Sequence, residues 1–136
     1  VRANYGLGMV YGFHTDKPKQ GRTYLRKAAY EIPVTVKNRP HVVDARFALG
    51  KLEFQEGRIQ EAQQAFEKIL EMESISRESR FLALKNIGDV HRSRNAKELA
   101  KEYYHKAYEI QPTDSSVRSR LRQLGVTVED RFNRFE

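Results

Sequence analysis

The residue types that most often carry catalysis are present in this chain but are scattered along it. The sequence has four histidines: His14, His41, His91 and His105. No two of them stand four residues apart, the spacing that would place both on one face of a helix, so we expect no metal site. No serine stands in a nucleophile elbow and no HExxH sequence occurs. The absence of cysteine excludes disulfides, thiolate zinc sites and cysteine nucleophiles.

Glycines and carboxylates are the other groups whose spacing could indicate chemistry. Gly6, Gly8 and Gly12 lack the spacing of a dinucleotide-binding loop and no strand precedes them, so we interpret Gly8 as a small packing residue. No carboxylate pair stands alone in apolar surroundings that would favour acid-base catalysis. The acids of the middle segment are interpreted as a solvated helix face: Glu53, Glu56, Glu61, Glu67 and Glu71. The sequence therefore predicts no enzyme and no cofactor.

The composition favours a thin helical fold. The chain has 136 residues, enough for one domain, of which 32% are charged and 39% hydrophobic. A mean hydropathy of -0.75 suits elongated helical proteins, in which much of each helix stays in water. No apolar run has the length of a membrane span. Residue 1 is not methionine, so we expect the chain to continue upstream, and the compartment stays open, with the cytoplasm slightly favoured over the periplasm.

Positive charge is concentrated in the first third of the chain. Residues 1–43 contain eight Lys or Arg and two acids, whereas residues 44–74 contain four and seven, within a net charge of +7. A basic nucleic-acid-binding module is therefore an alternative function, using Lys17, Lys19, Arg22, Arg26, Lys27, Lys37 and Arg39. We expect no aromatic interleaving there, and no nucleic-acid motif or block of like charges occurs, so nucleic acid is not the expected partner.

An internal repeat organises most of the sequence. A Leu-Gly or Ile-Gly pair occurs at Leu7-Gly8, Leu49-Gly50 and Ile87-Gly88. After each pair, a small residue, a Leu or aromatic residue, and later a Pro or Ser recur at matching offsets, with one extra residue in the first copy. The small residues are Gly21, Ala62 and Ala100, and the large ones are Leu25, Phe66 and Tyr104.

This spacing predicts pairs of helices that cross closely. Small residues on both helices let the axes approach, and we expect the Leu or aromatic side chain to fill the space between one hairpin and the next. The Pro or Ser that follows would end the second helix. Each repeat is therefore a helix, a tight turn, a second helix and a stop.

The pattern resembles the tetratricopeptide repeat (TPR), most closely in Ala48-Leu49-Gly50-Lys51, Gly57-Arg58 and Glu61-Ala62. The resemblance covers roughly residues 1–114, with departures at Ile69, Ser74 and Asn95. It implies an all-α fold, a right-handed superhelical stack of antiparallel helical hairpins of the alpha-solenoid type. It also implies a scaffold or adaptor that binds another protein and is not an enzyme.

The resemblance and local signals give the expected boundaries. We predict helices near residues 1–14, 18–32, 42–56, 59–73, 77–93 and 96–110, with an extended linker over 34–41. Asp16, Ser76 and the Asn95–Glu98 capping box are expected to begin helices. A final helix capped by Asp114 and ended by Gly125 should bury Val117, Leu121 and Leu124 and turn Arg118, Arg120 and Arg122 to water. A single domain over 1–125 is predicted, with repeats at about 1–34, 43–74 and 77–114, a capping helix at 114–125 and a tail at 126–136.

A partner site follows from the resemblance. In such a stack the second, fifth, ninth and twelfth places of each first helix line the concave groove. Apolar and charged residues at these places predict a groove that holds a segment of another protein: Tyr5, Met9, Phe47, Lys51, Phe54, Lys85, Asp89 and Arg92. Alternatively, Phe47 and Phe54 belong to the core. Besides the adaptor and the nucleic-acid-binding module, a third possible function is self-assembly into a homo-oligomer through the uncapped first repeat.

Overall fold

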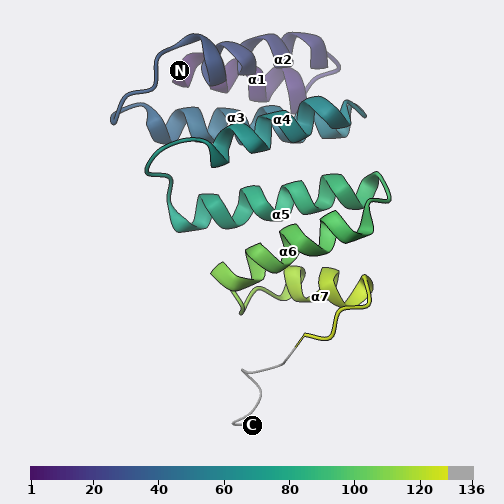
Figure 1. The fold of residues 1–136 in the computed structure, drawn as a ribbon. Coiled ribbons are helices and arrows are strands. Elements are labelled where there is room, and N and C mark those ends of the chain that lie inside the picture. The colour runs from purple at the N-terminus through teal and green to yellow at the C-terminus, as the bar shows by residue number, and fades with distance from the viewer. Residues whose placement is uncertain (129–136) are drawn as a thin grey trace. The chain divides into compact units, whose positions relative to one another are not determined.

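A computed structural model describes residues 1–128 of the chain. Over this range the chain is built of helices and contains no strand, which confirms the predicted all-α class (Figure 1). The helices are α1 (Arg2–Phe13), α2 (Pro18–Arg26), the π-helical turn η1 (Lys27–Glu31), α3 (Arg39–Gln55), α4 (Ile59–Leu70), α5 (Arg77–Ser93), α6 (Lys97–Ile110) and α7 (Ser115–Gln123). The chain divides into two compact units, Val1–Ser74 and Ile75–Glu136, and each is described by itself.

The repeat glycines are contact points inside each hairpin. A Cβ atom added to Gly50 would lie 2.5 Å from the Phe66 ring, and one added to Gly88 would lie 2.6 Å from the Tyr104 ring. The equivalent atom on Gly8 would lie 2.5 Å from the Leu25 side chain. The close helix crossing is confirmed. The large residue lies against the glycine of its own hairpin, and Leu25 also belongs to the core cluster that includes α3 residues of the next hairpin.

Unit 1 is formed by two hairpins, α1 with α2 and α3 with α4, and α2 also packs on α3. Its core uses small residues heavily: Leu25, Ala28, Ala29, Ala45, Ala48, Leu49, Leu52 and Ala65. The α1–α2 crossing is so close that a Cβ on Gly21 would lie 2.3 Å from the backbone nitrogen of Gly12. Helices at this separation exclude side chains from the crossing point.

Glu53 is buried in unit 1, so its assignment to a solvated helix face is wrong. Only 1% of the residue is exposed. Its carboxylate accepts hydrogen bonds from the guanidinium of Arg22 on α2 and from Arg58 Nε at 3.0 Å. The backbone oxygen of Glu53 also accepts from the Arg58 nitrogen at 2.8 Å. The buried charge is thus paired on both sides, which a carboxylate at this depth requires.

Unit 2 contains α5, α6 and α7, and two of its predicted caps are confirmed. The Ser76 hydroxyl accepts from the Ser79 nitrogen at 3.0 Å, and the Asp114 carboxylate accepts from the Val117 nitrogen at 3.0 Å. Gly125 follows α7 with a φ of +84°, the left-handed conformation expected after a helix end. Val117 and Leu121 of α7 are buried, as predicted, while Leu124 is only partly buried.

Other local predictions need correction. Lys17 and Ala96 stand at the caps of α2 and α6 without side-chain cap bonds, so neither Asp16 nor a capping box begins these helices. The linker is shorter than expected because α3 begins at Arg39. A turn precedes it, in which the Asn38 side chain accepts from the Thr35 nitrogen at 2.7 Å.

Asn95 occupies the same turn position as Gly57, seven residues after the repeat glycine. Its φ is +63°, close to the +76° of Gly57, and glycine adopts this region without steric cost. We therefore expect Asn95→Gly to keep or slightly raise stability and Asn95→Ala to lower it by about 1 kcal/mol, because alanine lacks asparagine's tolerance of this region. Urea unfolding of the variants measures the difference. Equal stability of the alanine and glycine variants would contradict the turn conformation.

Candidate functional site

The predicted partner residues of unit 1 lie on α1 and α3 and are buried to different degrees. Tyr5 and Met9 are half-buried and pack against the core of the unit. Burial, and then the nearby Asp44 carboxylate, raise the pKa of Tyr5 above its ordinary value, so its hydroxyl stays a neutral hydrogen-bonding group. Phe47 is half-buried, with its ring centre 6.3 Å from that of Phe66.

Phe54 and Lys51 are the more accessible members of this set. Phe54 keeps 36% of its surface exposed, which is unusual for a phenylalanine in a helix that buries eight other residues. Lys51 is exposed one turn earlier on α3. The residues Tyr5, Met9, Phe47, Lys51 and Phe54 are called the first-helix face of unit 1 below.

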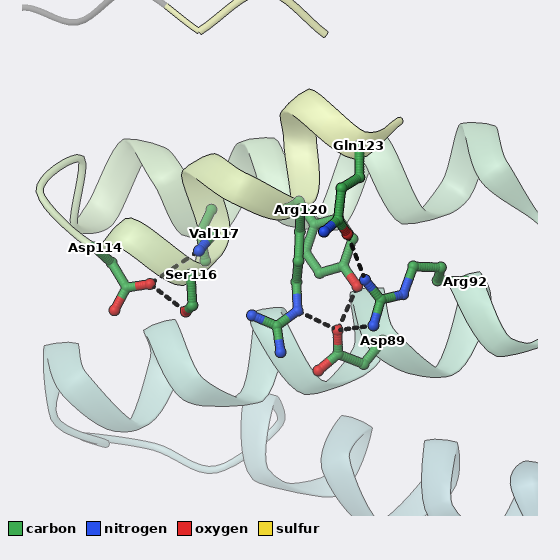
Figure 2. Close-up of polar contacts among 8 residues, drawn as sticks. Asp89, Arg92, Asp114, Ser116, Val117, Arg120 and Gln123 are labelled. Atoms are coloured by element: carbon green, nitrogen blue, oxygen red, sulfur yellow. Dashed lines mark hydrogen bonds and ion pairs between the residues drawn. The ribbon is translucent and has the colours of Figure 1, made fainter. Parts of the chain in front are cut away.

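The predicted residues of unit 2 are engaged with one another and with α7 (Figure 2). The Asp89 carboxylate accepts hydrogen bonds from the Tyr104 hydroxyl and from Arg120 Nε at 2.7 Å. Arg92 approaches the same carboxylate at 3.8 Å and donates to Gln123 at 3.3 Å. Asp89 therefore joins α5 to α6 and α7. The prediction that Arg120 faces water is wrong, because its guanidinium binds Asp89.

The surroundings of Tyr104 in this cluster keep its phenol protonated. Burial first, and then the hydrogen bond to Asp89, raise the pKa of Tyr104 well above its ordinary value, so the phenol remains a donor.

Lys85 is the remaining predicted residue of unit 2, and its ammonium lies 5.9 Å from the centre of the Phe81 ring. Hydrogen bonds to the Ser116 side chain and the Val117 backbone outweigh burial and lower the pKa of Asp114.

The basic segment of the first repeat contains stacked aromatic rings, which corrects the expectation that it lacked them. Tyr11 and Tyr24 stack with ring centres 5.6 Å apart and planes inclined by 15°. The Lys17 ammonium lies over Tyr11 at 5.8 Å and the Lys27 ammonium over Tyr24 at 5.9 Å. Arg22, by contrast, is turned to Glu53 and does not contribute free charge.

A cleft of about 400 Å³ lies elsewhere in unit 1. Its lining is polar and comes largely from α4, together with residues of α2, η1 and α3: Arg26, Tyr30, Leu49, Glu53, Glu61, Gln64, Glu67, Lys68 and Glu71. Much of its charge is balanced internally. Glu61 pairs with Arg58 at 3.6 Å and Glu71 with Lys68 at 3.0 Å. The cleft therefore offers little unbalanced charge for a ligand.

Other site types can be compared with residues 1–128. In this range His, Asp and Glu do not gather in a group of three or more that could hold a metal ion. None of the helices in the same range has the length and apolar character needed to cross a membrane. Leu7 and Val10 on α1 remain 41% and 49% exposed, and self-association through this helix stays a prediction. The distal tail residues Phe132 and Phe135 lie outside the described range.

The buried position of Glu53 could have been found from the repeat register. Tyr11, Glu53 and His91 each stand three residues after a repeat glycine. Glu53 and His91 are buried, and the His91 ring stacks on Tyr103 at 5.3 Å as Tyr11 stacks on Tyr24. The shared offset is thus a signal that this position is turned into the helix packing, toward the second helix of its own hairpin for Tyr11 and His91 and toward α2 of the preceding hairpin for Glu53.

The repeat pattern also appears in comparison with known families. A family model described as tetratricopeptide repeat matches residues 17–79 and again residues 47–115. A comparison with curated proteins gave no match. The two family matches overlap and together extend over residues 17–115, most of the chain, which include α2 to α6 and leave α1 outside. Tetratricopeptide repeats generally mediate interactions between proteins. The chain belongs to the tetratricopeptide repeat family.

Proposed function

We propose that this chain is a non-enzymatic adaptor and that the first-helix face of unit 1 binds a segment of another protein. The family generally mediates protein interactions, which supports the class of partner. The observation that carries the choice of face is the 36% exposure of Phe54 beside the exposed Lys51. A partly exposed aromatic residue next to a cation is typical of the centre and rim of a binding surface.

The remaining members of the face would have graded roles. Tyr5, Met9 and Phe47 are half-buried, so each presents an edge that a partner could cover without losing its packing on unit 1. Apolar anchors of this kind hold a complex, whereas Lys51 would steer the encounter. On unit 2, taken by itself, Lys85 and Arg92 are proposed partner contacts, and Asp89 would orient Arg92.

Phe54→Ala should weaken partner binding by about 1–2 kcal/mol, because it removes a large apolar contact area. Its effect on folding should be smaller, since the side chain is already partly in water. The partner is first captured with the whole chain as bait and mapped to a peptide. Titration of that peptide against each variant, with a melting curve for each, gives the two effects separately.

Leu99→Ala is the matched control, because Leu99 is a 45% exposed apolar residue on α6, a second helix. It should leave affinity unchanged. Lys51→Glu should act mainly on the association rate and on its salt dependence. If Phe54→Ala lowers stability while the affinity of folded molecules stays the same, Phe54 serves the core and this face is not the binding surface.

A further inference from the structure

A second surface of unit 1 combines a stacked pair of tyrosine rings with exposed lysines, a combination that the first-helix face of unit 1 lacks. Between Lys17 and Tyr30 the sequence has five basic residues and no acid. Arg22 is neutralised by the buried Glu53, while Lys17, Lys19, Arg26 and Lys27 are exposed. We call Lys17, Lys27 and the stacked Tyr11 and Tyr24 the basic tyrosine surface, because each lysine lies over one of the two rings, whereas Arg26 lines the cleft beside α4. It lies on α1, α2 and the residues that flank α2.

The same stack in unit 2 shows what is particular to this surface. There His91 stacks on Tyr103, and Lys106 lies 5.0 Å from the centre of the Tyr103 ring, as Lys27 does near Tyr24. A stacked pair with a lysine is therefore a packing element of the hairpin. In α6, however, lysines alternate with acids, and Lys101 and Lys106 pair with Glu98 and Glu102. In the first repeat the lysines have no acids among them.

We propose that the basic tyrosine surface binds single-stranded nucleic acid. A nucleobase stacks on an aromatic ring more strongly than an exposed ammonium interacts with it, so a base can replace the lysine over Tyr24 or Tyr11. The displaced ammonium is then beside the ring, where the phosphate of the stacked nucleotide lies. Excess positive charge next to aromatic rings is the combination that single-strand binding proteins use.

Other polyanions fit this surface less well. An acidic peptide or an anionic membrane would satisfy the lysines and leave the ring faces without a stacking partner. A duplex presents phosphates but keeps its bases stacked inside, so it also gains nothing from the tyrosines. Stacking is thus the property that separates a single strand from the other ligands.

The probe is a fluorescently labelled 12-nucleotide RNA of mixed sequence, titrated with the whole chain and followed by anisotropy. We expect binding at low salt, with a slope of log affinity against log salt of about -1.4 if Lys17 and Lys27 each meet a phosphate. The same strand as a duplex, and polyglutamate of equal charge, should bind at least about fivefold more weakly because neither offers free bases. Equal affinity for all three probes would overturn the proposal, as would no RNA binding at low salt.

Substitutions localise the binding. Tyr24→Leu should weaken RNA binding about fivefold or more, and Lys27→Gln should lower the magnitude of the salt slope by about 0.7. Tyr103→Leu and Lys106→Gln are the matched controls in α6 and should leave both quantities unchanged. Since Tyr24→Leu could also loosen the hairpin, its melting curve is compared, and the exposed Lys17→Gln and Lys27→Gln variants test the surface without touching the core. Equal losses of RNA affinity in the α2 and α6 variants would refute the assignment of RNA binding to the basic tyrosine surface.

Discussion

Gly88→Leu is expected to destabilise unit 2 by about 1–3 kcal/mol or more, because its side chain has no space to occupy. Even the Cβ atom would lie 2.6 Å from the Tyr104 ring, a distance that such contacts do not show in folded proteins. The ring cannot move aside easily, since its hydroxyl donates to Asp89 and the residue is fully buried. Urea unfolding followed by circular dichroism measures the loss.

A pair of alanine variants separates this contact from helix propensity. Gly88→Ala and Gly6→Ala each replace a glycine inside a helix, which by itself favours the helix by about 1 kcal/mol. A Cβ on Gly6 has nothing within 4 Å, so Gly6→Ala should be neutral or stabilising. Gly88→Ala should lose stability instead. If Gly88→Leu unfolds at the same urea concentration as the parent chain, the repeat register is wrong.

Glu53→Ala should lower the stability of unit 1 by about 3 kcal/mol, because it removes the common partner of two arginines from a buried position. The Arg22 side chain, 18% exposed, would be left with its charge partly desolvated. Arg58 is 43% exposed and can turn to water, so it contributes less to the loss. Urea unfolding again gives the free energy of unfolding.

The control for Glu53 is its exposed neighbour. Glu56→Ala should change stability by no more than about 0.5 kcal/mol, because Glu56 lies on the surface. A double-mutant cycle between Glu53→Ala and Arg22→Ala should show strong coupling, whereas Glu53 and Glu98, which lie in different units, should be additive. Equal effects of Glu53→Ala and Glu56→Ala would show that the carboxylate is not held as described.

The repeat register explains why most of the fold could be predicted. Gly50 and Gly88 recur with Phe66 and Tyr104 at one offset, and such spacing is fixed by helix geometry and by the size of the contact. Ser76 and Asp114 cap helices through bonds to residues three positions away, so they too are local. The helix spacing and these two caps, which depend on neighbours in sequence, are therefore predicted correctly, whereas Asp16 and the Asn95–Glu98 capping box are not the caps of α2 and α6.

A second group of errors concerns side chains whose partners are far along the chain. Glu53 meets Arg22 across 31 residues, and Arg120 meets Asp89 across the same separation. The sequence shows that Glu53 and Arg120 are charged but not which residues they contact, so the sequence alone predicts that each faces the solvent. The Tyr11–Tyr24 stack was missed for the same reason, because its rings come from two helices.

The ion pairs of Glu53 and Asp89 also make the repeats non-interchangeable. Glu53 reaches back to Arg22 in the preceding hairpin, whereas Asp89 reaches forward to Arg120 in α7. The position equivalent to Arg22 is Gln63 in the second hairpin. A chain engineered with the second hairpin in tandem would set Glu53 of the added copy against an uncharged amide. In a protein lengthened by duplication, Glu53 of the added copy would keep Arg58 as a partner, and an arginine at position 63 of the preceding copy would be needed to restore the second ion pair.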